Sequence, residues 1–361
     1  MAFRSLHQIF RTSAALLVVL TALIAAGCGQ EESGGGSASG GGSVSGGGFA
    51  PSEGSLVIYS GRNEELVGPI IEGFEEESGI DVEVRYGETA ELAATILEEG
   101  RNSPADVFFS QDAGALGAVA DRERLQELPE DALSRVEERF RDPDSRWIGI
   151  SGRARVVVYN TEALSEEDLP DSILEFTDPE WRDRIGWPPT NGSFQAFLTA
   201  LRLVEGEETA REWLEGIQDN EPRRYADNLA ALEGVASGEV EVGFINHYYL
   251  YRLREERGED VEARNHFLSN GDPGALVNVA GIGILSSTRN SAEAEEFLHF
   301  MLSEEAQQYF ADETFEYPLI EGVQINEELV PLTEIETPNI NLSNLDDLEG
   351  TLELLRETGV L

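Results

Sequence analysis

The chain of 361 residues carries 70 acidic and 25 basic side chains, which gives a formal net charge of −45 at pH 7. A phosphate backbone needs a basic face, so this balance argues against nucleic acid as a partner and against adhesion to an anionic membrane surface. Arginine supplies nearly all of the positive charge, and the acidic surplus fits a high-salt setting in which ions screen the self-repulsion.

The first 27 residues have the pattern of an export signal. Two arginines precede an apolar stretch that is too short for a comfortable membrane span, and small residues lead to Cys28, the only cysteine. A lone cysteine in this place resembles a bacterial lipobox, whose cysteine is lipidated and begins the mature protein. An ordinary cleaved signal peptide with a stray thiol is the alternative. Residues 28–53, rich in glycine and serine, predict a flexible tether.

The folded part begins near residue 54 and alternates strands with helices. Apolar runs at 56–59, 82–84 and 106–109 predict strands, and helical spacing at 66–74 and 92–97 predicts helices between them. This order implies an α/β fold with a mostly parallel sheet and helices on both faces. Ligands bind such sheets at the carboxyl ends of the strands.

The remaining elements predict a second lobe of the same kind. An extended pair at 148–150 and 156–160 could cross between the lobes, and an apolar run at 277–285 could return. We expect lobe 1 to comprise residues 54–154 plus 281–361, and lobe 2 residues 155–280. Further helices and strands are expected at 193–203, 210–217, 229–235, 240–245, 261–267, 292–301, 304–310 and 345–355.

Two adjacent tyrosines, Tyr248 and Tyr249, follow the strand that ends near Asn246. Neighbours on a helix point about 100° apart, so the pair cannot fill one core stripe, but it can converge on a small ligand. Phenol oxygens are hard donors that ionise at neutral pH only beside a strong positive charge, such as Fe(III). The structural alternative is that two aromatic rings help to seal a lobe.

Enzyme signatures are not visible in the sequence. It has no nucleophile elbow, zinc-protease motif, phosphate-binding loop or dinucleotide fingerprint. His266 and His299 are expected to be structural, whereas His247 adjoins the tyrosines and has a possible site role. We therefore expect a binding protein and not an enzyme.

Five segments of the folded part are the basis of a comparison with a known family: Ile58 to Arg62, Glu77 to Ile80, Asn102 to Phe109, Gly152 to Asn160, and Asn246 to Tyr249. Together they resemble the ferric-iron-binding solute receptors of ABC importers. The resemblance covers residues 55–361 and implies a two-lobed periplasmic-binding-protein-like fold of type II that closes over Fe3+. With the lipobox-like Cys28, we expect an extracytoplasmic, lipid-anchored monomer that delivers iron to an ABC permease.

The metal ligands of that family match this sequence unevenly. The tyrosine pair corresponds to Tyr248 and Tyr249, and a further tyrosine used by some members corresponds to Tyr159. Where the family offers histidine and glutamate from the first lobe, this chain has Asn63 and Gln111, which are neutral and poor ligands for Fe(III). Either three phenolates neutralise the ion, or the receptor takes a chelated ferric complex and these two amides hydrogen-bond the chelator.

An anion such as carbonate or phosphate is held in some members by small polar groups. The matching positions are Gly192, Ser193, Asn228 and Asn246, although Gly192 and Ser193 could also be a plain helix start. Arg62 and Arg153 are further candidates, since arginine grips carboxylates and phosphates with two hydrogen bonds. Surface salt bridges are their alternative role.

Two other functions remain open at this point. The same fold could bind an organic or phosphorylated solute such as a phosphonate, thiamine or polyamine, which the missing histidine and glutamate favour. A secreted enzyme on an α/β scaffold is the more distant alternative.

Overall fold

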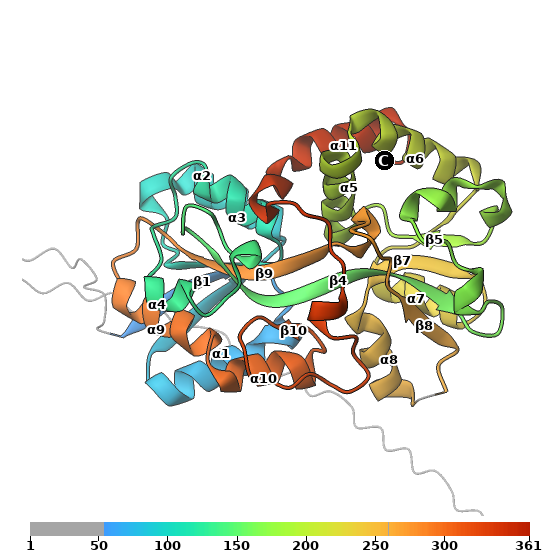
Figure 1. Ribbon diagram of the computed structural model, residues 1–361. Coiled ribbons are helices and arrows are strands. Elements are labelled where there is room, and N and C mark those ends of the chain that lie inside the picture. Colours follow the sequence, from blue (N-terminus) through green and yellow to red (C-terminus); the bar gives the residue numbers. More distant parts are fainter. Residues whose placement is uncertain (1–53, 259) are drawn as a thin grey trace, which may run out of the picture. The chain divides into compact units, whose positions relative to one another are not determined.

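The computed structural model describes residues 54–258 and 260–361 (Figure 1). The expected export signal, Cys28 and the glycine-rich tether lie outside these ranges. Within them, no helix is long and apolar enough to cross a membrane.

A ten-stranded sheet runs through the described part of the chain in the order β2-β1-β3-β9-β4-β7-β5-β6, with β8 and β10 also paired to β4. The outer groups are parallel, as the sequence predicts, but β4 and β9 run antiparallel to their neighbours and make the sheet mixed. The strands are β1 (Ser55–Ser60), β2 (Asp81–Tyr86), β3 (Val107–Ser110), β4 (Ile148–Asn160), β5 (Ile185–Trp187), β6 (Arg223–Arg224), β7 (Val242–Asn246), β8 (Ala263–His266), β9 (Val277–Ile284) and β10 (Tyr317–Pro318).

Strand β4 joins the two lobes of the fold. Its first part, up to Ala154, pairs with β9, and its second part, from Arg155 onwards, pairs with β7 and β8. The two extended runs expected at 148–150 and 156–160 are therefore one continuous strand. A strand that passes through both lobes fixes the position of its side chains relative to each of them.

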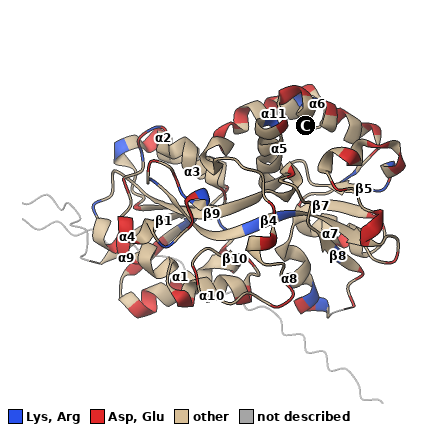
Figure 2. Ribbon diagram, viewed as in Figure 1, with Lys and Arg blue, Asp and Glu red and all other residues tan. Residues whose placement is uncertain are grey.

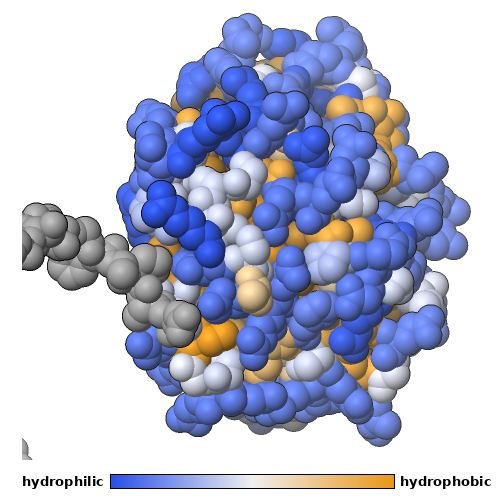
Figure 3. All heavy atoms as spheres, turned by 90° about the vertical axis from the view of Figure 1, so that its left-hand side faces the viewer, coloured by the Kyte–Doolittle hydropathy of each residue, from blue (hydrophilic) through white to orange (hydrophobic). Residues whose placement is uncertain are grey.

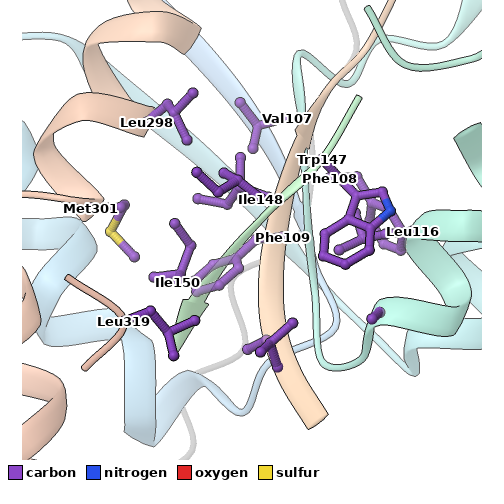
Figure 4. Packing of buried hydrophobic residues seen from close by; sticks show 14 of the residues in the cluster. Val107, Phe108, Phe109, Leu116, Trp147, Ile148, Ile150, Leu298, Met301 and Leu319 are labelled. Carbon is purple, nitrogen blue, oxygen red and sulfur yellow. The ribbon is translucent and has the colours of Figure 1, made fainter. Parts of the chain in front are cut away.

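The first lobe packs helices against the β2-β1-β3-β9 part of the sheet. In its core, shown in Figure 4, Phe108 lies beside Trp147 and Phe109 beside Ile150, because successive strand side chains point to opposite faces. The helices that follow or cover these strands are α1 (Glu64–Ser78), α2 (Thr89–Glu99), α3 (Ala113–Ala120), α4 (Glu130–Leu133), α9 (Ser291–Met301) and α10 (Glu304–Glu313).

The second lobe has its own core around β5 and β7. Four tryptophan and phenylalanine rings, those of Phe194, Phe197, Trp213 and Phe244, contact one another there. The helices of this lobe are α5 (Gly192–Glu205), α6 (Glu207–Asp219), α7 (Asn228–Ala236) and α8 (Tyr248–Arg257).

The last helix, α11 (Leu348–Glu357), corrects the expectation that all of 281–361 belongs to the first lobe. Its Leu354 and Leu355 are buried in the core cluster of the second lobe, and Thr351 bonds Thr199 of α5 at 2.7 Å. An amphipathic pattern shows that a helix needs an apolar partner but does not identify the partner. The lobe boundaries along the rest of the chain stay a prediction.

Just before α11, the short 3-10 helix η8 (Leu342–Asp346) lies against α3 of the first lobe. The contact is close because α3 has glycines there: a Cβ at Gly117 would lie 2.5 Å from the carbonyl oxygen of Ser343. The hydroxyl of Ser343 also accepts a bond from the Trp147 indole at 3.2 Å. The chain is thus held to the first lobe immediately before it enters the second.

Replacing Gly117 with alanine should destabilise the protein by about 1–3 kcal/mol, because the new methyl group meets a backbone atom that can only move with η8. Gly73→Ala is the matched control, since its Cβ would find only a side-chain atom of Phe300, at 4.0 Å. That change should be neutral or stabilising by up to about 1 kcal/mol. Denaturant unfolding of both variants checks this, and equal stabilities would contradict the tight contact.

Acidic residues are frequent on the outer helices of the described part, and a basic segment lies in the middle of β4 (Figure 2). The face of the first lobe in Figure 3 is mainly hydrophilic, with only scattered hydrophobic residues. The basic residues on β4 differ from the acidic ones in being buried in the middle of the sheet.

Candidate metal site

The tyrosine pair lies where β7 ends and α8 begins (Figure 1). Tyr248 is the first residue of α8 and only 1% exposed, and it belongs to the core cluster built mainly by the first lobe. The rings of Tyr248 and Tyr249 stack with centroids 4.4 Å apart and planes 26° apart. The two phenols thus lie together at the junction of the lobes.

The Tyr249 phenol is protonated in the absence of a cation. Burial raises its pKa well above the usual value, Tyr248 raises it further, and Arg153 opposes both. Only a strong positive charge beside the oxygen would displace that proton at neutral pH.

His247 supports the pair and is not a free ligand. Its Nδ1 accepts the backbone N–H of Ala154 at 3.2 Å, and its Nε2 lies 2.9 Å from the carbonyl oxygen of Phe315, to which it donates. Burial lowers the pKa of His247 to about 4, so the ring is neutral and this tautomer follows from its partners. Because both nitrogens are used, its role is to fix the turn between β7 and α8.

Arg155 forms hydrogen bonds with three of the predicted anion-binding residues of the second lobe. Its Nη1 donates to Asn246 Oδ1 at 3.1 Å and to Asn228 Oδ1 at 3.2 Å, and it lies 3.4 Å from Ser193 Oγ. Burial lowers its pKa to about 9. Ser193, Asn228 and Asn246 therefore form one cluster around Arg155, and their role in binding an anion stays a prediction.

Arg155 itself was missed at the sequence level. A signal was present, because Arg153 and Arg155 are two residues apart in an otherwise buried strand and therefore face the same side of the sheet. Gly192 lies beside the cluster as the first residue of α5, but the cap of that helix is Asn191, whose side chain accepts the Ser193 N–H at 3.1 Å.

In the first lobe, Arg62 makes a buried ion pair with Glu316. Its Nη2 donates to both carboxylate oxygens, at 2.8 and 2.9 Å, and Ser151 Oγ donates to one of them at 2.5 Å. Burial by itself would raise the pKa of Glu316, but Arg62 and Arg153 outweigh it and hold the pKa below the usual value. Arg62 is thus neutralised inside the protein and is not a surface salt bridge.

The two amides expected to contact the cargo are already engaged through their oxygens. Gln111 Oε1 accepts from Arg62 Nη1 at 2.8 Å, which leaves its amide N–H groups as the available donors. Asn63 is exposed and its Oδ1 caps α1 by accepting the Glu65 N–H at 2.8 Å. The amide N–H groups of Asn63 remain as donors, and its contact with the cargo stays a prediction.

Arg153 bonds Gln111 of the first lobe and lies near Tyr248 and Tyr249. It is 3% exposed, and its Nη2 donates to the backbone oxygen of Gln111. Its Nε and Nη1 have no hydrogen-bond partner among the residues that the structure describes. Burial lowers the pKa of Arg153, as does the charge of Arg62. A buried cation with unpaired donors is costly, so the site is chemically suited to an anion.

Tyr159 does not lie with the other tyrosines, which corrects its assignment as a metal ligand. It pairs with Val242 at the start of β7, whereas Arg155 pairs with Asn246 at the end. Four residues along a strand span roughly 13 Å. The Tyr159 side chain is buried in the second-lobe core, in a cluster that includes Leu164 and Leu169. Tyr159 therefore matches a ligand position of the family in sequence, but in this structure it is a core residue.

Within residues 54–258 and 260–361, no group of three or more histidine, cysteine, aspartate or glutamate side chains could hold a metal ion. What the site offers is two phenols from one lobe and hydrogen-bond donors on both sides. Such a set can bind a highly charged cation together with an anion.

Comparisons with known proteins identify the family of the chain. Residues 102–341 match the model of a family described as bacterial extracellular solute-binding protein. The chain is 34% identical over 313 residues to the major ferric iron-binding protein of Neisseria meningitidis, covering 86% of this chain and 94% of that protein.

Two solved structures share the fold. Iron-bound HitA from Pseudomonas aeruginosa superimposes with a TM-score of 0.80 and is 36% identical, covering 85% of this chain and 99% of its own. A Trichodesmium protein in complex with iron and citrate gives a TM-score of 0.75 at 28% identity, with coverages of 85% and 99%. The fold is therefore that of two-lobed periplasmic binding proteins, and the chain belongs to the ferric iron-binding family of bacterial extracellular solute-binding proteins.

Proposed function

We propose that this protein captures Fe3+ between its two lobes through the phenolate oxygens of Tyr248 and Tyr249 and delivers it to an ABC permease. The iron is cargo, and no covalent chemistry is performed. Support comes from the buried, stacked tyrosine pair and from relatives whose names describe ferric iron binding. Phenolates are hard anionic donors, which suits a trivalent ion.

An anion completes the site. The single observation that carries this is Arg153, a buried guanidinium beside the tyrosines with two nitrogens that lack partners among the described residues. On the second-lobe side, Ser193, Asn228 and Asn246 surround Arg155, and Gly192 opens α5 next to them. Carbonate or phosphate fits such groups, as does a carboxylate of an organic chelator.

The first lobe supplies hydrogen-bond donors where the family has metal ligands. With its oxygen held by Arg62, Gln111 can only donate toward the cargo. Two phenolates leave most of the coordination sphere of Fe(III) open, and the anion or chelator then fills it. A chelated cargo is supported by a structural neighbour from Trichodesmium that is described as in complex with iron and citrate ligands.

The remaining parts of the proposal concern where the protein works. A signal over residues 1–27, lipidation of Cys28 and a tether to residue 53 would anchor it outside the cytoplasm, next to its permease. Closure of the lobes on the cargo would create the form that the permease recognises. We expect a monomer.

Spectroscopy of the iron-free protein titrated with ferric citrate, or with ferric ion and carbonate, tests this function. We expect a visible tyrosinate-to-iron absorption band and one iron per protein by native mass spectrometry. Because iron replaces phenol protons, the apparent affinity should fall as the pH falls. A protein that gives no band with either source and is isolated with an organic or phosphorylated solute would instead support the alternative receptor function.

A further inference from the structure

A second polar pocket lies away from the tyrosine pair, between α8 and β8 of the second lobe and the segment 328–330. Its volume is about 370 Å³, and its lining residues are Leu250, Tyr251, Arg254, Arg264, Asn265, Phe267, Glu328 and Val330. None of these side chains has a part in the proposed iron site.

The pocket spans the two lobes. Segment 328–330 belongs to the first-lobe side, because the Tyr317 hydroxyl of β10 donates to the Val330 carbonyl oxygen at 2.8 Å and Leu329 is buried in the first-lobe core. The opposite wall is α8, whose Tyr251 donates from its hydroxyl to the Glu328 carbonyl oxygen at 3.2 Å. A ligand here would contact both lobes at once.

The charge of the lining is unusual for this protein. Two arginines face one glutamate, in a chain whose acidic residues outnumber its basic ones 70 to 25. Arg254 is 8% exposed and held by the Ala263 carbonyl oxygen at 2.8 Å, so it cannot turn away to solvent. Arg264 is exposed, and its Nη1 donates to the same carbonyl oxygen at 3.0 Å. Both guanidinium groups thus donate to the carbonyl oxygen of Ala263, which holds them close together.

The carboxylate of Glu328 occupies the place in this pocket where the carboxylate of a ligand would contact Arg254. Its Oε2 lies 3.3 Å from Arg254 Nη1, a long contact, and its side chain is 46% exposed. Such a pair is worth little in water and is readily exchanged for another carboxylate. Leu250, Phe267 and Val330 supply an apolar wall beside it.

We propose that this pocket binds a small organic monocarboxylate with an apolar body. The carboxylate takes the place of Glu328 on Arg254 and Arg264, and the apolar body packs on Leu250, Phe267 and Val330. The charge selects an anion, and the mixed lining selects an organic one over an inorganic ion. This pocket uses none of the residues of the proposed iron site.

Calorimetric titration of the iron-free full-length protein with benzoate tests the proposal, because benzoate carries one carboxylate on an apolar ring. We expect saturable binding at one site, weakened about fivefold in Arg264→Gln. Glu328→Gln should strengthen binding, since it removes the internal competitor. Benzamide, which has the same shape without the charge, should bind at least about fivefold more weakly than benzoate.

Arg182→Gln is the matched control, as Arg182 is an exposed arginine paired with Glu221 on the surface. It changes the net charge by the same amount and should leave benzoate affinity unchanged. Each substitution lies at an exposed side chain, so folding is expected to be preserved and is checked by thermal unfolding. The absence of saturable binding, or equal affinities in Arg264→Gln and Arg182→Gln, would overturn the proposal, as would loss of binding in Tyr249→Phe.

Discussion

Tyr249→Phe is expected to weaken ferric iron binding by more than about 100-fold. Loss of an outer-shell partner of a metal ligand costs up to about 100-fold in affinity, and loss of the ligand itself should cost more. The substitution removes the anionic oxygen and keeps the ring, so the stacking on Tyr248 can persist. Tyr248→Phe should have a similar effect, and the double variant should lose the visible absorption band altogether. Absorption spectra and iron competition with a chelator of known affinity measure both quantities.

Tyr159→Phe is the control that tests whether Tyr159 is a metal ligand, as the family resemblance implies, or a core residue, as the structure indicates. Its hydroxyl is removed in the same way, but it pairs near the start of β7, far from Tyr248. We expect the band and the affinity to be unchanged. If Tyr159→Phe abolished the band while Tyr249→Phe kept it, the placement of the metal site at the start of α8 would be wrong.

Glu316→Gln should destabilise the fold by about 3–5 kcal/mol, the range for breaking a buried ion pair by removal of one partner. Arg62 and Glu316 are fully buried, and the variant leaves the guanidinium of Arg62 without its ion-pair partner. Urea unfolding gives the free energy. The matched control is Glu221→Gln, whose partner Arg182 is exposed, and that change should cost less than about 1 kcal/mol.

The same ion pair predicts a pH dependence of stability. Because the pKa of Glu316 is held below that of an unfolded glutamate, its ionised form stabilises the protein above the unfolded value of about 4.3. This stabilisation is lost as the pH falls through the lower native pKa. As the pH falls from about 4.3 to the native pKa, the unfolding free energy of the wild type should therefore decrease more steeply than that of Glu316→Gln. Parallel curves would contradict the assignment.

The α/β alternation, the end of β7 and the tyrosine pair follow from the sequence alone. Period-two and helical spacing are local properties, so they identify the strands and helices of the first lobe and the turn after Asn246. Adjacent tyrosines at a strand end are also a local signal, because neighbours on a helix point about 100° apart and cannot both fill one core stripe. Ser193 and Asn228, by contrast, were assigned through the resemblance to the family, and both lie in the first turn of a helix.

Only the tertiary structure shows which of these groups meet. Arg62 and its partner Glu316 are 254 residues apart, and Arg62 also donates to the oxygen of Gln111, which leaves only the amide N–H groups of Gln111 as donors. Tyr159 and Arg155 lie four positions apart in β4, yet the pairing with β7 puts one in the core and the other among the polar groups. The packing of α11 on the second lobe is a further case. Local spacing sets the type of each element, whereas long-range pairing sets the partners of each side chain, and the chemistry of this site depends on those partners.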